Sequence, residues 1–491
     1  MVLDIYSIFA YRLPMCGSGI IWYHRGRKGT IPAMNSEKTG TSRNDRRKDY
    51  RVRKSLRYSI FDGAFSASMI GFGESFFVAF GLFLKSTTLQ VGLLSSLPQA
   101  LGSMLQFFSN GLIRAFGSRK RLVVTAALLQ GLMYVPVALV FFFEEFRVQQ
   151  LILFACLYWA FGMILGPAWN SWMGDLVSED RRGAYFGRRS NITGTATFVA
   201  ILAAGYILQQ CGGSIQKQYT GFVLIFLLAL TSRMISVLFL SKQYEPVYEV
   251  PREAEFGFLE FLQQARFRNY GLFVLYLGLM NFAVFMSVPF FTPYMLQDLH
   301  LSYLTFTMVN AAAILVKMLS MPVWGHAADR FGARRVLSLT GFLMPLVPVL
   351  WLLSGEVAWL MTIQAYSGFI WGGFEIASFS FIFDTTTPQK RATCVAYYNM
   401  INGLALFSGA LLGSAIVRMN TAFWSKYLLV FLVSGLFRIV ASLFFLPRLR
   451  EVRTVETIGY SRLFLKVVTS LPTMGLVYGL IPFRRKQEYD E

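Results

Sequence analysis

Ionisable residues lie inside several long apolar stretches of the sequence, where a charge is costly. Glu74 falls within 58–84, Lys317 within 302–325 and Glu375 within 357–383. A charged side chain at the centre of a bilayer costs about 2.5–3.5 kcal/mol even on a lenient insertion scale, so such residues are candidates for a functional site. A carboxyl group removed from water also tends to keep its proton near neutral pH. Glu74 and Glu375 are therefore candidates for binding a coupling proton.

The neighbours of these residues leave two interpretations open. Two glycines beside Glu74 permit close helix approach or a local bend. Trp371 lies one helical turn before Glu375, and Lys317 is a candidate buried partner for that carboxylate. These residues form either a solute and proton site or a buried structural pair that would be costly to break. The predicted substrate and coupling residues are Glu74, Asn281, Lys317, Trp371 and Glu375.

The segments that carry these residues are long enough to cross a bilayer. The chain has 491 residues, of which 55% are hydrophobic and 15% are charged. Soluble domains carry about 25% charged residues, so this composition predicts an all-α polytopic membrane protein. Twelve apolar segments lie near the crossing length of about 20 residues. They are 58–84, 89–113, 121–143, 149–173, 188–210, 219–241, 269–296, 302–325, 335–354, 357–383, 394–417 and 424–446.

The motifs that the sequence lacks limit the chemistry. It has no P-loop, no Gly-x-Ser-x-Gly elbow and no paired His-Glu zinc motif, and its four cysteines and three histidines lack metal-ligand spacing. We therefore expect no enzyme, no cofactor, no metal and no ATP-driven pumping. The net charge of +20 falls in loops and in the N-terminal tail, which favours cytoplasmic loop charge over nucleic-acid binding.

A basic turn occurs twice, each time between two apolar segments. The second copy reads Gly-His-Ala-Ala-Asp-Arg-Phe-Gly-Ala-Arg-Arg over 325–335, and a degraded first copy spans 110–121. Gly332 suits a tight reversal, where a positive φ is cheap for glycine. Two further features recur in register, namely a helix-exit aspartate followed by a basic pair and an arginine inside the sixth and twelfth segments. They are Asp175 with Arg182, Asp384 with Arg391, and Arg233 with Arg438. Such repeats predict two pseudo-symmetric six-helix bundles.

The turn at 325–335 resembles the signature loop of the major facilitator superfamily, Gly-x-x-x-Asp-Arg-x-Gly-Arg-Arg. The resemblance covers roughly 57–446, and it implies that helices one, four, seven and ten line a cavity. It also implies a cytoplasmic latch, in which Asp329 meets Arg188 and Arg189 at the start of the fifth helix and holds the outward-open state. The predicted gate residues are Gly111, Arg114, Gly117, Arg119, Asp175, Arg182, Arg188, Gly325, Asp329, Arg330, Gly332, Arg334, Arg335, Asp384 and Arg391.

The first copy of the loop departs from the family pattern, because Arg114 stands where the family has Asp. Our hypothesis is an inverted pair of Arg114 with Asp384; the alternative is that Arg114 is an ordinary positive-inside charge. Arg233 and Arg438 suit structural anchors that snorkel or pair with Asp175 and Asp384. The fourth segment lacks the arginine typical of the family's antiporters, so proton coupling is left open.

The charge distribution predicts the topology and the domains. Basic turns alternate with turns that carry few Lys or Arg, so both termini are expected in the cytoplasm. The predicted domains are a basic tail 1–56, a bundle 57–241, a linker 242–268 with an amphipathic piece at 256–267, a second bundle 269–446 and a tail 447–491. Residues 1–33 are a candidate over-extended start, and 463–481 is predicted to be interfacial rather than a thirteenth span.

Together these features predict a secondary active transporter that moves a small organic solute by alternating access. We expect a monomer in a bacterial cytoplasmic membrane, with membrane lipids, a small-molecule substrate and H⁺ as candidate partners. The alternatives are a lipid flippase and a transporter-like receptor on the same fold. Transport in proteoliposomes would separate the receptor from the other two.

Overall fold

The computed structural model describes residues 43–143, 145–178, 182–246, 269–385, 388–419, 423–456 and 458–470. Within these ranges every regular element is helical. In the described part of the chain, ten helical stretches are long and apolar enough to cross a membrane. The other two predicted segments are also helical, but the first of them is broken by a short 3₁₀ turn.

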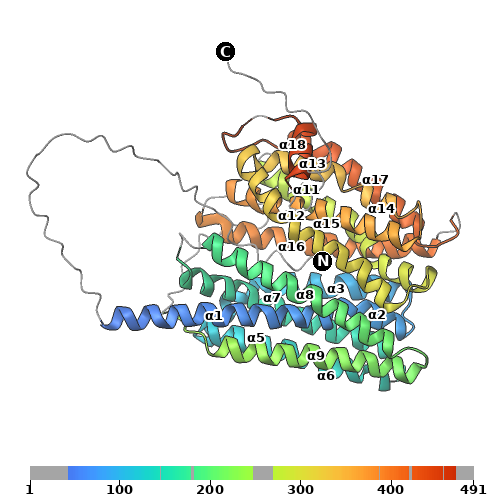
Figure 1. The fold of residues 1–491 in the computed structure, drawn as a ribbon, viewed down its shortest axis with the longest axis horizontal. Helices are drawn as coiled ribbons and strands as arrows, with labels where there is room; N and C mark the ends of the chain where they lie inside the picture. The colour runs from blue at the N-terminus through green and yellow to red at the C-terminus, as the bar shows by residue number, and fades with distance from the viewer. Residues whose placement is uncertain are drawn as a thin grey trace, which may run out of the picture.

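The N-terminal half forms the lower layer of Figure 1 and the C-terminal half the upper layer. The first half comprises α1 (Arg43–Phe72), η2 (Glu74–Phe76), α2 (Phe77–Phe83), α3 (Thr88–Leu105), η3 (Gln106–Phe108), α4 (Ser109–Phe116), α5 (Arg119–Leu132), α6 (Tyr134–Leu139), η4 (Val140–Phe142), α7 (Arg147–Leu176), α8 (Arg182–Gln210) and α9 (Ile215–Ser241). The second comprises α11 (Asn269–Pro293), a π-helical turn η6 (Tyr294–Asp298), α12 (Tyr303–Phe331), α13 (Ala333–Leu343), α14 (Leu346–Leu350), α15 (Val357–Thr385), α16 (Pro388–Met419), α17 (Leu428–Phe445), η7 (Leu446–Arg448) and α18 (Tyr460–Thr469).

Two boundaries differ from the predicted ones. Helix α1 begins at Arg43, inside the segment predicted as a basic tail, because a helix rich in Arg and Lys can extend past the apolar region into water. The predicted interfacial piece 463–481 begins with α18, whose inward residues Leu463 and Val467 are buried; its remainder lies outside the described residues. The predictions on 1–33 and on the amphipathic piece 256–267 also fall outside the described residues.

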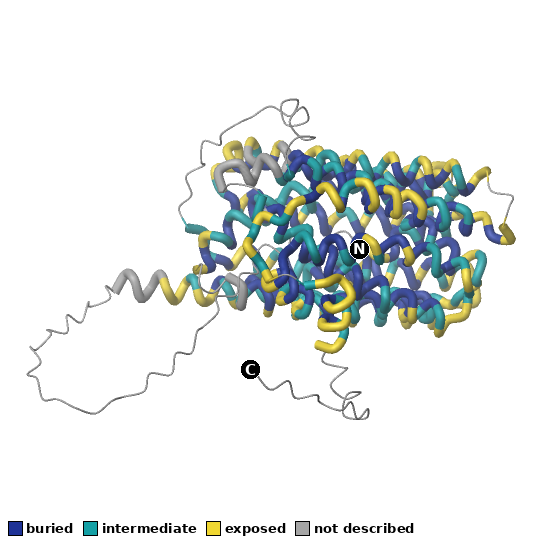
Figure 2. Tube along the Cα trace, turned by 90° about the horizontal axis from the view of Figure 1, so that it is seen from above, coloured by how far each residue is buried: buried dark blue, intermediate teal, exposed yellow. Residues whose placement is uncertain are grey.

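The basic turns lie at one end of the bundles, which we call the basic end. We call the far end of the bundles the opposite end. Gly117 and Gly332 end helices with φ of 62° and 96°, as expected for glycine in a tight reversal. Buried residues fill the interior of both layers, and exposed residues follow the outer helices (Figure 2). The exposed apolar surface of those helices is the surface that would face lipid.

The two halves meet along two seams, α3 against α16 and α8 against α12. Glycines allow the close approach: a Cβ on Gly92 would collide with Ser414, one on Gly205 with Thr307, and one on Gly403 with Ser103. Near the basic end, by contrast, a Cβ on Gly111, Gly174 or Gly325 would meet nothing within 4 Å. The described contacts therefore close the halves against each other at the opposite end and near the middle.

Two Gly→Ala substitutions, one in the seam and one outside it, are expected to differ in their effect on stability. Gly205→Ala adds a methyl group against Thr307 and is expected to destabilise the closed seam by about 1–3 kcal/mol through overpacking. Gly174→Ala enters open space and is expected to be neutral or stabilising by about 0.5–1 kcal/mol. The thermal unfolding midpoints of both purified variants in detergent check this contrast, and equal midpoints would contradict it.

Candidate functional site

The C-terminal half holds an ion pair near the middle of its helices. Lys317 of α12 lies 2.7 Å from a carboxylate oxygen of Glu375 in α15, and the two side chains are only 11% and 9% exposed. Gly368 and Gly372 bring α15 close to α12 at this level. The structure thus forms the buried pair that the sequence left as one of two interpretations.

Other polar side chains lie on the helices of the same half. Asn281 of α11 is buried and lies within hydrogen-bonding reach of Tyr398 in α16. Trp371, predicted to share a face with Glu375, packs edge-to-face on Phe374 with ring centroids 5.8 Å apart. Other amides bond across helices, Gln364 to Asn310 within the half and Asn399 to Gln106 across the α3–α16 seam.

The N-terminal half presents Glu74 at a break in its first membrane helix. Helix α1 ends at Phe72, a 3₁₀ turn spans Glu74–Phe76 and α2 continues from Phe77. The hydroxyl of Tyr158 in α7 donates a 2.9 Å hydrogen bond to Glu74. Gly73 lets the phenol ring of Tyr134 approach the break, since a Cβ there would collide with that ring. The glycines beside Glu74 suggested a bend, but no sequence signal marked the two tyrosines.

A second buried carboxylate, Asp62 of α1, was missed by the sequence analysis. Its oxygens accept a 2.7 Å hydrogen bond from Ser236 and lie 3.6 Å from a guanidinium nitrogen of Arg189. Arg233 donates to Ser236, Ser66 and Gln130 beside it. The guanidinium of Arg189 also stacks over the ring of Trp169 at 4.3 Å. Helices α1, α5, α7, α8 and α9 are therefore joined by one polar network.

This network corrects the prediction for the two intramembrane arginines. Arg233 is anchored beside Asp62 and not by Asp175, which binds Arg119 instead. Arg438 in the other half donates to Ser287 and to the carbonyl of Met344, and not to Asp384. Both arginines are buried, so they do not snorkel to the membrane surface. The role of structural anchors agrees with these contacts, but the partners predicted for them were wrong.

Each half closes its basic end with a glutamate that follows its last membrane helix. In the N-terminal half, Glu245 accepts from the backbone of Lys120 and the hydroxyl of Ser118 at the start of α5. In the C-terminal half, Glu451 accepts from the backbone of Arg334 at the start of α13. An anion at a helix N-terminus satisfies amide groups that have no partner within the helix. These two caps are a further element of the pseudo-symmetry that the sequence analysis did not find.

The cations at the basic end differ between the halves. Arg119, fully buried, pairs with Asp175 at 2.7 Å and approaches Glu245 at 3.8 Å. In the C-terminal half Arg453, from the segment after the last membrane helix, pairs with Asp384 and lies 3.8 Å from Asp329.

The contacts at the basic end differ from two predicted pairs. Arg114 is exposed, and Asp384 binds Arg453, so the proposed Arg114–Asp384 pair is not the contact that this structure forms. Asp329 contacts Arg453, and of the two arginines predicted to meet it, Arg188 is exposed and Arg189 binds Asp62. Both predictions assumed contacts between halves, whereas the ion pairs described here join residues of the same half. The side chains of Arg182 and Arg391 lie outside the described residues.

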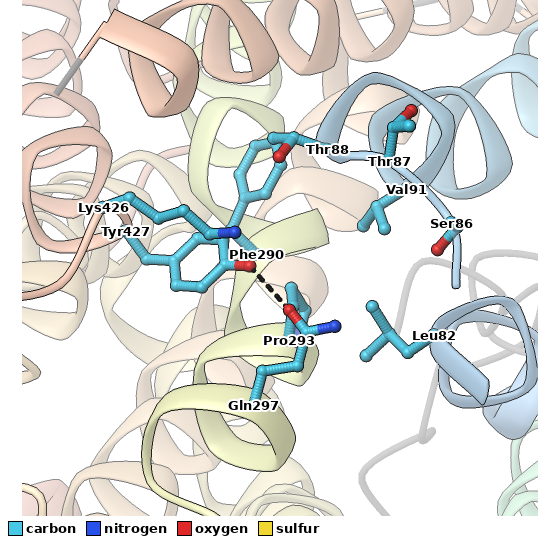
Figure 3. A pocket seen from close by; sticks show the side chains of 10 residues that line it. All are labelled: Leu82, Ser86, Thr87, Thr88, Val91, Phe290, Pro293, Gln297, Lys426 and Tyr427. Atoms are coloured by element: carbon cyan, nitrogen blue, oxygen red, sulfur yellow. Dashed lines mark hydrogen bonds between the residues drawn. The ribbon is translucent and has the colours of Figure 1, made fainter. Parts of the chain in front are cut away.

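A cavity of about 260 Å³ opens between the halves at the opposite end. Figure 3 shows Leu82 and Val91 of the N-terminal half facing Phe290, Gln297 and Tyr427 of the C-terminal half. The hydroxyl of Tyr427 donates to Gln297 at 3.0 Å. The cavity is the outermost part of the interface between the halves.

Two related helical halves, a seam between them and charged groups buried at mid-depth define a membrane transport protein. The sequence profile of the Major Facilitator Superfamily matches residues 63–314 and again residues 275–482. The chain therefore belongs to this superfamily.

Individual proteins match only parts of the chain. Efflux pump dotC of Dothistroma septosporum is 29% identical over 187 residues, which cover 36% of this chain and 31% of that protein. Multidrug resistance protein 3 of Bacillus subtilis is 28% identical over 128 residues, 26% of this chain and 25% of that protein. The chain thus matches less than a third of the length of these curated relatives.

Solved structures share the fold at low identity. A bacterial homolog of the human lysosomal transporter Spinster, inward-facing and occupied, gives a TM-score of 0.60 at 15% identity, covering 86% of this chain and 98% of that one. A mutant of the nucleoside transporter NupG gives 0.59 at 13% identity, covering 81% and 100%.

Proposed function

We propose that the protein is a proton-coupled secondary transporter that moves a small organic solute by alternating access, with Glu74 as the proton carrier. The observation that carries this proposal is the contact between Glu74 and Tyr158. A tyrosine hydroxyl both donates and accepts, so it can bond the ionised carboxylate and the protonated acid alike. Glu375 is less suited to carry a proton, because protonation would cost it the ion pair with Lys317.

The proposed orientation places the basic end and both chain termini in the cytoplasm of a bacterial cell, because Lys and Arg concentrate in cytoplasmic loops. The described contacts between the halves then lie toward the periplasmic end, as an inward-open state requires. In this state the solute site lies between Glu74 of one half and the Lys317–Glu375 pair of the other. A monomer suffices for this mechanism, since one chain supplies both halves.

Glu74→Gln is expected to abolish stimulation of transport by a pH gradient while leaving solute exchange at equal pH measurable. The amide keeps the shape of the side chain but carries no titratable proton. The assay is uptake and efflux in proteoliposomes with and without a pH gradient, and the probes are uridine and the dye ethidium. Uridine is chosen because a structural neighbour is a nucleoside transporter, and ethidium because a relative is a multidrug resistance protein.

The control is Glu356→Gln, which changes an acidic residue in an exposed turn. Gradient stimulation should fall at least about tenfold in Glu74→Gln, the scale expected when a proton-transferring group is lost, and stay unchanged in the control. Unaltered stimulation in both variants would remove Glu74 as the carrier. Probe binding without movement would favour a receptor.

A further inference from the structure

Helix α1 carries exposed cations at the level where its apolar stretch begins. Lys54 and Arg57 are exposed, and Phe61, about one turn further along the helix, is 52% exposed. The three residues recur at intervals of three and four, so they lie along one face of α1. This face therefore changes from cationic to aromatic within about one helical turn.

Two hydrogen bonds fix this part of α1 to the N-terminal half. The buried hydroxyl of Ser55 accepts a 2.7 Å hydrogen bond from the backbone of Tyr244, which follows α9. The hydroxyl of Tyr185 in α8 donates to the carbonyl of Leu56 at 3.3 Å. The exposed cations beside these two residues are thus held on an anchored helix and keep a defined position relative to the bundle.

Helix α9 forms the second wall of the same surface. It runs beside α1 in the lower layer of Figure 1, and Phe239 stacks on Phe61 and Phe65 with ring centroids 5.2 and 6.1 Å apart. Leu238 is 57% exposed, and Lys242, one turn later at the end of α9, is exposed as well. We call the surface formed by the following residues the α1–α9 surface: Lys54, Arg57, Phe61, Leu238, Phe239 and Lys242.

The cations of the α1–α9 surface differ from others at the basic end. In the described part of the chain, no carboxylate pairs with Lys54, Arg57 or Lys242. Arg119 and Arg189, by contrast, are buried and pair with aspartates of the same half. Three exposed cations next to apolar side chains of two membrane helices lie at the depth where lipid phosphates border the hydrocarbon.

We propose that the α1–α9 surface binds an anionic phospholipid, with Lys54, Arg57 and Lys242 around the phosphate and Phe61 and Leu238 along an acyl chain. Basic residues grouped beside a membrane helix attract anionic lipids. The continuity of the cations with exposed apolar side chains favours a lipid over a soluble anion, because only a lipid also covers the apolar part. The inference depends on neither the solute, the coupling ion nor the orientation of the proposed function.

The test measures lipid binding to the purified protein by native mass spectrometry. The parent is titrated with phosphatidylglycerol, which is anionic, and with phosphatidylcholine, which is zwitterionic, and should bind the anionic lipid at least about fivefold more tightly. Arg57→Gln with Lys242→Gln is expected to weaken phosphatidylglycerol binding about 25-fold, about fivefold for each cation, and to leave phosphatidylcholine binding unchanged.

The matched control is Arg121→Gln with Arg450→Gln. It removes two exposed arginines at the same end of the bundles but outside the α1–α9 surface, so the net charge changes equally. This variant is expected to bind phosphatidylglycerol as the parent does. Equal weakening in the two double variants would overturn the proposal, because it would indicate a general attraction of the basic end for anions. Equal affinity of the parent for the two lipids would overturn it as well.

Two further measurements address the ligand and the fold. Inorganic phosphate and glycerol 3-phosphate are added as competitors and are expected to leave the lipid bound, whereas displacement by either would assign the cations to a soluble anion. Phosphatidylglycerol is also expected to raise the thermal unfolding midpoint of the parent and the control, but not that of Arg57→Gln with Lys242→Gln. An equal rise in all three proteins would contradict a site on this surface.

Discussion

Lys317→Ala is expected to destabilise the protein by about 3–5 kcal/mol, the largest effect of any single substitution near the mid-depth site. The change leaves the carboxylate of Glu375 buried without the ammonium that lies 2.7 Å from it. Attraction across such a short distance offsets the free energy spent in removing both charges from water. When the ammonium is removed, the desolvation of the carboxylate is no longer offset by this attraction. The thermal unfolding midpoint of the purified protein in detergent measures the loss.

A double variant separates structure from transport at this pair. Lys317→Met with Glu375→Leu removes both charges and keeps the volume, so its stability is expected to return to that of the parent or exceed it. If the double variant folds and still transports, the pair is a structural tie. If it folds but does not transport, the pair belongs to the solute site. Stability of Lys317→Ala equal to that of the parent would contradict the energetic argument itself.

Asp62→Ala is expected to lower the free energy of unfolding by a similar amount, about 3–5 kcal/mol. Here the group left buried without its counter-charge is a cation rather than an anion. The substitution removes a buried anion and leaves the guanidinium groups of Arg189 and Arg233 close together in the interior. Five helices of the N-terminal half contribute to this network, so its loss is expected to lower the unfolding midpoint of that half and the yield of folded protein.

The control for Asp62 lies on the same helix. Asp49→Ala makes the same chemical change at an exposed position of α1 and is expected to alter stability by less than about 0.5 kcal/mol. A midpoint measurement on both variants tests the contrast. Comparable midpoints would mean that Asp62 does not compensate the two arginines.

The sequence predicted the fold well because its signals are local. Each apolar segment is recognised from its own composition, and the repeated basic turn marks the two halves without any contact being known. The Lys317–Glu375 pair also followed from local reasoning, because two opposite charges in apolar helices have few other ways to be neutralised. All twelve predicted segments contain helix in the structure for the same reason, and ten of them fall in stretches long and apolar enough to cross a membrane.

What the sequence did not predict depends on contacts between distant residues. Asp62 sits near the start of a segment, where an acidic residue is ordinary, and nothing in the sequence links it to Ser236 or Arg189. Arg453 and Glu451 lie in a charged tail that resembles a solvated end. The partners proposed for Arg114 and Asp329 assumed one state of the cycle, and a sequence does not specify which state is populated.

Glu245 and Glu451 have a consequence for where each folded half ends along the chain. Each glutamate follows the buried arginine in the last membrane helix of its half at nearly the same spacing. Glu245 lies twelve residues after Arg233, and Glu451 lies thirteen after Arg438. Each caps the second residue of its half's third membrane helix. Both glutamates lie beyond the last membrane helix of their half, so in each half the piece of chain after the sixth crossing belongs to the folded unit.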